Sequence, residues 1–158
     1  VCGSSPYQVP NAFFCPRDRS IAWDRGVLLP IGQRYFGPMS VVGLVAHEYG
    51  HALQHMAGTV DDTSPPVVLE QQADCFAGVW ANRADAARGG KMIDDKDVEQ
   101  ALAAASAIGD DRLQRQAQGR VVPDSFTHGS SAQRMRWFRV GLESGDPRKC
   151  DTFSAKQL

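Results

Sequence analysis

The chain has 158 residues, which is long enough for one domain with a substantial hydrophobic core. Its 17 basic and 18 acidic residues leave a net charge of −1, which excludes the strongly basic surface of a nucleic-acid-binding protein. No apolar run approaches the roughly 18 residues that a membrane-spanning helix requires. The chain starts at Val1 without a methionine, so we expect a processed form from which an upstream signal or membrane anchor has been removed.

The first 36 residues predict a small β-hairpin. Two short strand-like runs, NAFFC at 11–15 and SIAWD at 20–24, flank the turn-like PRDR. Several proline and glycine residues surround these runs. We therefore expect an N-terminal hairpin region over residues 1–36.

From residue 37 onward the sequence predicts helices. Gly37-Pro38 opens the first, because proline suits the first helical turn, and Gly58 ends it. Three of the other four helices are expected at 66–88, at 98–108 behind a cap at Asp94, and within 110–117. The last runs from the capping box of Ser130 and Gln133 to about Ser144, with Gly145 as its stop. The expected fold class is mainly α (α+β): one domain over 1–158, with a helical core at 37–158.

The stretch VAHEYGHALQH, at 45–55, contains the pattern HExxH in His47, Glu48 and His51. Because a helix turns about 100° per residue, His47 and His51 lie about 40° apart on one face, one turn from each other. Two imidazoles in that position can share one metal ion. Glu48 then lies beside the metal, where it can take a proton from a water in the open position. Two histidines alone bind zinc poorly, so a third ligand is required.

The second predicted helix offers the third ligand. Glu70 and Asp74 are four residues apart and therefore share a face. Glu70 is expected to bind zinc through a carboxylate oxygen, and Asp74 to hydrogen-bond the far nitrogen of a zinc-bound histidine. The alternative is that both are solvated positions early in an amphipathic helix.

Three further polar side chains bear on this site. His55 is predicted not to be a ligand, because it lies about 80° round and two turns beyond His47. His128 lies in a loop before the last helix, where it could donate a hydrogen bond to an oxyanion, cover the zinc, or only fix the loop. Arg134 either pairs with a carboxylate of the site or belongs to a solvated face.

The four cysteines are Cys2, Cys15, Cys75 and Cys150. None forms a CxxC pair, so a four-sulfur zinc site is not expected. We favour the disulfides Cys2–Cys15 and Cys75–Cys150, which imply an oxidising, extracytoplasmic compartment. The alternative is buried free thiols in a cytosolic protein.

Four blocks of the sequence resemble the neutral zinc metallopeptidase family of bacteria. They are FFCPRDRSIAWD, VAHEYGHALQH, LEQQADCFAGVWAN and FTHGSSAQRMRWFRVGLESGDPRKCDTF, and they occur in order over nearly the whole chain. The resemblance implies a gluzincin-like zinc peptidase with a zincin-like helical core, often membrane-anchored or exported. It implies His47, His51 and Glu70 as zinc ligands, Glu48 as base and Asp74 behind the ligands. The block around His128 is similar to the Thr-His-Pro block of related integral-membrane zinc peptidases, with Gly129 where that proline would stand.

The expected function is hydrolysis of peptide bonds by a zinc-dependent endopeptidase with Glu48 as general base. The partner is then a peptide or protein substrate, which the hairpin could hold by adding its backbone as a strand. The expected location is the bacterial cell envelope, secreted or membrane-anchored. Two alternatives stay open: a silent or latent zinc domain that binds envelope or protein partners, and an amidase that acts on cell-wall peptides. The sequence carries no signal for an oligomeric state.

Overall fold

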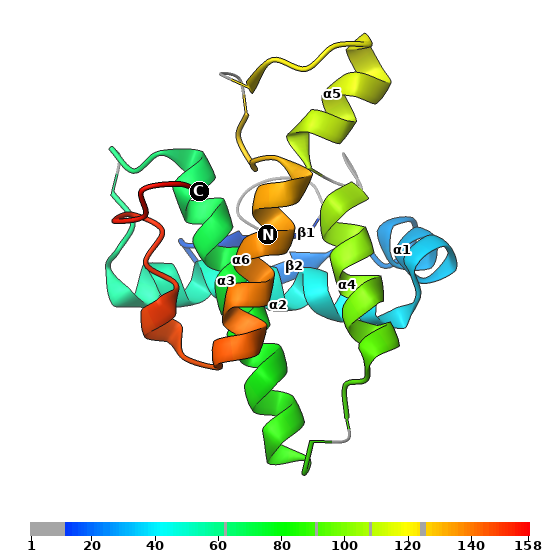
Figure 1. Cartoon of the computed structure of the whole chain (residues 1–158), viewed down its shortest axis with the longest axis vertical. Coiled ribbons are helices and arrows are strands. Elements are labelled where there is room, and N and C mark those ends of the chain that lie inside the picture. Colours follow the sequence, from blue (N-terminus) through cyan, green and yellow to red (C-terminus); the bar gives the residue numbers. More distant parts are fainter. Residues whose placement is uncertain (1–11, 62, 91, 108, 124–125) are drawn as a thin grey trace.

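The computed structural model describes residues 12–61, 63–90, 92–107, 109–123 and 126–158. In these ranges it is mainly helical, with one two-stranded antiparallel hairpin near the N-terminus, as predicted. Figure 1 shows helices α3 (Pro66–Ala87) and α6 (Ser131–Ser144) side by side, with α2 (Pro38–Ala57) crossing behind them. No helix within the described ranges is long and apolar enough to cross a membrane.

The hairpin consists of β1 (Ala12–Cys15) and β2 (Ser20–Trp23), within one residue of the predicted strands. Their register pairs Ala12 with Trp23 and Cys15 with Ser20. Cys15 is fully buried. The predicted disulfide to Cys2 lies outside the described residues, because Cys2 is not among them.

A helix that the sequence analysis did not predict, α1 (Leu28–Phe36), follows the hairpin. Pro30 and Gly32 made this segment look irregular, but Pro30 occupies the first turn, where the missing N–H has no helical partner to lose. The carboxylate of Asp24 accepts hydrogen bonds from the backbone N–H groups of Val27 and Leu28 at 2.5 and 2.8 Å, which stabilises the helix start. The expected hairpin region, 1–36, therefore also contains a helix.

Helices α2 and α3 match the two longest predicted helices. Pro38 begins α2, and Gly58, in the left-handed region with φ 66°, ends it. The two helices touch at Gly50, where a Cβ would lie 2.8 Å from both the Cα and the carbonyl oxygen of Ala73. Glycine at position 50 therefore allows the backbones of α2 and α3 to approach closely.

Replacing Gly50 by alanine should destabilise the protein by about 1–3 kcal/mol, because the added methyl group meets backbone that cannot move independently. Gly43 is the matched control on the same helix: a Cβ there meets only the Cβ of Ala101, at an ordinary 3.6 Å. Gly43→Ala should be neutral or stabilising, since alanine favours helix more than glycine does. Urea unfolding of the two variants measures the difference; equal midpoints would contradict the close contact.

Two of the last three α-helices have the caps that the sequence predicts. Helix α4 (Asp95–Ala107) is preceded by Asp94, whose Oδ1 accepts a hydrogen bond from the N–H of Asp97 at 2.9 Å. Helix α5 (Asp110–Gln118) follows it. Helix α6 begins with the predicted reciprocal capping box between Ser130 and Gln133, and Gly145 ends it with φ 58°.

The C-terminal segment returns to α3 after the short helix η2 (Pro147–Lys149). The predicted disulfide Cys75–Cys150 is present and joins this segment to the middle of α3. Both cysteines are buried beside Trp137 of α6. A second cluster, formed by Ala46, Ala77, Ala81, Leu102 and Phe138, packs α2, α3, α4 and α6 together. These contacts fix the crossing of α2 and α3 on which the site depends.

Candidate metal centre

Three predicted ligands meet where α2 crosses α3. The Nε2 atom of His47 lies 3.1 Å from Oε2 of Glu70, and Nε2 of His51 lies 3.4 Å from Oε1 of the same carboxylate. One ligand atom from each of the three residues falls within 4.8 Å of the others, so together they could hold a metal ion. His55 is not in this group: it is exposed, and its ring lies 5.7 Å from that of Phe14.

The hydrogen bonds behind these ligands make the cluster fit a cation. Nδ1 of His47 lies 2.7 Å from Oδ1 of Asp74, so the proton of a neutral imidazole sits on Nδ1. The lone pair of Nε2 then faces the carboxylate of Glu70. Oε2 of Glu70 is buried and has no hydrogen-bond partner of good geometry. Two buried acceptors facing one another are stable only with a positive charge between them.

A proton on Nε2 of His47 would supply this positive charge where no metal is bound. Burial alone would lower the pKa of His47, but the charge and hydrogen bond of Asp74, helped by Glu70, raise the pKa to about 10. Although burial opposes it, the adjacent imidazoles of His47 and His51 hold the pKa of Glu70 well below its usual range. A metal ion and this proton would therefore compete for the position between Nε2 of His47 and the carboxylate of Glu70, and metal binding would release the proton.

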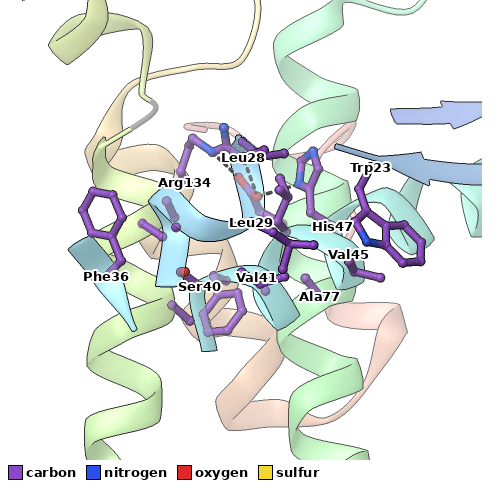
Figure 2. Close-up of a pocket in the computed structure, with 18 of the residues that line it drawn as sticks. Trp23, Leu28, Leu29, Phe36, Ser40, Val41, Val45, His47, Ala77 and Arg134 are labelled. Atoms are coloured by element: carbon purple, nitrogen blue, oxygen red, sulfur yellow. Dashed lines mark hydrogen bonds and ion pairs between the residues drawn. The ribbon is translucent and has the colours of Figure 1, made fainter. Parts of the chain in front are cut away.

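Asp74 is held from behind by Arg134, which resolves the two alternatives for that arginine. Its guanidinium donates from Nε to Oδ2 at 2.9 Å and from Nη2 to Oδ1 at 2.8 Å, and its side chain is only 4% exposed. Figure 2 shows Arg134 and His47 turned toward the same point between the helices. Despite its burial, Asp74 has a lowered pKa because Arg134 and then His47 stabilise the charged carboxylate.

Gln54 is a residue of the site that the sequence analysis did not assign. Its Oε1 lies 2.9 Å from Nδ1 of His51, and the side chain is fully buried. Position 54 is three residues after His51 and so lies beside it on the helix. That spacing could have indicated the contact.

Glu48 lines a cavity of about 300 Å³ together with the three candidate ligands. It is only 7% exposed. Among the described residues none forms a hydrogen bond or ion pair with its carboxylate. We call this space the site cavity; its other walls are Ala12, Phe13 and Phe14 of β1, Leu44, His128 and Arg134. The Glu48 carboxylate, which has no partner among the described residues, is therefore available to a water or a substrate there.

The loop that carries His128 is fastened by Asp110, a second residue that the sequence analysis missed. The Oδ2 atom of Asp110 accepts hydrogen bonds from the backbone N–H groups of Thr127, His128 and Gly129 at 2.6, 2.6 and 3.0 Å. Oδ1 lies 3.4 Å from Nδ1 of His128, whose ring is half-exposed at 52%. In the sequence Asp110 looks like an ordinary acidic residue at a helix start, so nothing there indicated the contact.

A second, apolar cavity of about 190 Å³ adjoins the site cavity, with which it shares Leu44, His47 and Arg134. Figure 2 shows Leu28 and Leu29 of α1 and Val41 of α2 around it, with Trp23 and Phe36 at opposite sides. Three of the polar side chains at its wall, His47, Asp74 and Arg134, bond to one another, and the hydroxyl of Ser40 donates to the carbonyl oxygen of Gly37. The cavity therefore offers mainly apolar surface to an occupant.

The described residues thus form a helical protein in which His47, His51 and Glu70 could hold a metal ion, with the carboxylate of Glu48 beside them. The family described as "Putative neutral zinc metallopeptidase" matches residues 1–153, and the chain belongs to that family. This confirms the resemblance found in the sequence.

The relatives that the chain matches are longer proteins. The uncharacterized protein Rv2575 of Mycobacterium tuberculosis is 40% identical over 175 residues, covering 99% of this chain and 59% of its own length. The uncharacterized protein YpfJ of Escherichia coli K12 is 40% identical over 167 residues, covering 96% of this chain and 57% of its own length. The chain thus spans less than two thirds of these relatives. No solved structure matches it.

Proposed function

We propose that the chain is a zinc-dependent endopeptidase. The observation that carries this proposal is the carboxylate of Glu48, a residue only 7% exposed and without a partner among the described residues, in the same cavity as the cluster of His47, His51 and Glu70. A purely structural metal site has no use for such a base, because structural zinc is closed by four protein ligands. Family membership supports the same reading.

The donor set suits zinc. Two imidazole nitrogens and one carboxylate oxygen form the ligand combination of catalytic zinc sites, which keep a fourth position open. When bound, zinc supplies a Lewis acid that polarises the scissile carbonyl and lowers the pKa of water towards about 7. Asp74 and Gln54 fix the ring orientation of the two histidines through their Nδ1 atoms.

Glu48 moves the proton. Its carboxylate accepts the proton of the attacking water and delivers it to the amine of the departing peptide. Its low exposure keeps bulk water from competing for the same role. The same carboxylate therefore serves both proton transfers of hydrolysis, first from the water and then to the leaving amine.

The substrate lies along β1 in this proposal. Ala12, Phe13 and Phe14 line the site cavity, so an extended peptide could run beside this strand and add its backbone to the hairpin. The apolar cavity next to it is larger than the roughly 150 Å³ apolar cavity that accepts benzene in another protein. We therefore expect cleavage beside large apolar residues.

His128 is assigned to the oxyanion. It lines the site cavity, and Asp110 and the Thr127 hydroxyl (2.9 Å) both face its Nδ1, which leaves Nε2 for the substrate. Replacing His128 by alanine should lower kcat by about 10²-fold, with little change in KM, because the lost donor acts only on charge that develops in the transition state. This is tested by steady-state kinetics, with the zinc content of each sample measured alongside. An unchanged kcat would show that His128 only fixes the structure of its loop.

The proposed location is outside the cytoplasm, in the bacterial cell envelope. The buried disulfide Cys75–Cys150 supports an oxidising compartment. A secreted form and a form anchored by an upstream membrane segment both agree with this.

The deciding experiment is incubation of the zinc-loaded protein with a mixed peptide library and, separately, with cell-wall fragments. Cleavage of peptides next to apolar residues, abolished by a chelator and restored by zinc, is the expected result. Cleavage of cell-wall fragments alone would replace the proposal by an amidase. Bound zinc without turnover of either would replace it by a silent or latent binding domain.

A further inference from the structure

A chain of hydrogen bonds leads from His51 of the metal centre through two buried glutamines to the C-terminal segment. It begins at His51, whose Nδ1 faces Oε1 of Gln54. The amide nitrogen of Gln54 donates to the carbonyl oxygen of Leu69 at 2.7 Å and to Oε1 of Gln72 at 3.1 Å. Since both of these partners only accept, the nitrogen of the Gln54 amide must face them and the oxygen must face His51. His51 is thereby fixed as a donor at Nδ1, with the lone pair of Nε2 toward Glu70.

The chain ends on a backbone carbonyl that cannot reorient. The amide nitrogen of Gln72 donates to the carbonyl oxygen of Cys150 at 2.9 Å. This contact turns Oε1 of Gln72 toward Gln54, so every hydrogen bond from His51 onward points the same way. Both glutamines are buried, with 1% and 7% exposure. No water can take over a bond that is lost there without entering the interior.

The position of the Cys150 carbonyl depends on covalent and polar anchors. The disulfide ties Cys150 to Cys75, one turn along α3 from Gln72. The hydroxyl of Thr152, which is 2% exposed, donates to the carbonyl oxygen of Val68 at 2.8 Å. The C-terminal segment is therefore fastened to the helix that carries Glu70.

We propose that Gln54 and Gln72 are positioning residues for the ligand His51, and that they transmit to it the position of the Cys150 carbonyl set by the Cys75–Cys150 disulfide. Zinc affinity then depends on a disulfide that contacts no metal ligand. The inference rests on the zinc site of the proposed function and does not require peptide hydrolysis.

The first test is the zinc affinity of Gln72→Met, measured by competition with a chromophoric chelator. Methionine keeps the volume of the side chain and removes both hydrogen bonds. Affinity should fall by about tenfold, the lower end for a group that supports a metal ligand. Gln71→Met is the matched control: Gln71 is the neighbouring buried glutamine of α3, and its amide donates to the carbonyl oxygen of His128 rather than to this chain. Its zinc affinity should stay that of the parent protein.

The second test joins Gln72→Met with the pair Cys75→Ala/Cys150→Ala. If the glutamine acts through the Cys150 carbonyl, each change alone weakens zinc binding and the combination costs little more than the disulfide change. Additive losses would overturn the inference. Should the disulfide-free protein fail to fold, nitrogen NMR of the His51 ring decides: the hydrogen-bonded Nδ1 proton should be present in the zinc-loaded parent and in Gln71→Met, and lost or shifted in Gln72→Met.

Failure of the inference is distinct from failure of the proposed function. A parent protein that binds no zinc overturns the zinc site itself. A parent that binds zinc, with the same affinity in Gln72→Met and Gln71→Met, overturns only the role of the glutamine chain.

Discussion

Glu48→Gln should retain zinc and lose peptide hydrolysis by about 10²–10⁴-fold in kcat/KM, the contribution of a general base. The amide has the shape of the carboxylate but cannot accept the proton of the attacking water. Glu48 is not one of the three residues of the metal cluster, so metal binding has no reason to change. Zinc content by elemental analysis and cleavage of a chromophoric peptide measure both halves of this result.

A matched control for this variant is Glu143→Gln on the exposed side of α6, which changes the net charge equally and lies outside the site cavity. It should cleave peptide at the rate of the parent protein. Full activity in Glu48→Gln would sink the proposed mechanism, whereas loss of zinc from that variant would show that Glu48 holds the metal.

Asp74→Asn should destabilise the protein by about 3–5 kcal/mol, because it leaves the buried guanidinium of Arg134 without its counter-charge. It also replaces the acceptor of the His47 Nδ1 proton, so zinc affinity should fall by about 10–100-fold. Denaturant unfolding in chelator separates the first effect from the second, which is measured by zinc competition.

The matched control is Asp146→Asn, which removes a carboxylate that also pairs with an arginine. Arg148 is 88% exposed, and solvent screens such pairs, so little stability should be lost. A further variant, Asp74→Leu/Arg134→Met, should regain much of the stability lost in Asp74→Asn but not the zinc affinity. Equal unfolding midpoints for Asp74→Asn and Asp146→Asn would contradict the buried pair.

The parts of the site that could be predicted were those with a local signal. His47 and His51 share a helix face by their spacing alone, and Glu70 and Asp74 share one on the next long helix. Glycine, proline and capping residues placed most of the helix ends within a few residues. These features depend on groups that are neighbours in the sequence, which periodicity can describe.

The parts that were missed depend on contacts between distant segments. Asp110 binds backbone amides 17 to 19 residues later, and no spacing rule expresses that. Gln54 is defined as much by Leu69 and Gln72 of the next helix as by His51. Helix α1 was not predicted because proline and glycine, here Pro30 and Gly32, usually interrupt helices. Pro30 is tolerated because it lies in the first turn of the helix.

Helix α3 has no solvent face over the five residues 71–75, all of which are buried. One side of this turn serves the metal cluster, another the His128 loop, and a third the C-terminal segment. An ordinary surface helix has an exposed face, whose positions recur every three or four residues and tolerate substitution. Here a saturation mutagenesis profile should instead show one unbroken block of intolerance, and the helix should accept neither an inserted nor a deleted residue, since either would rotate every one of these contacts by about 100°.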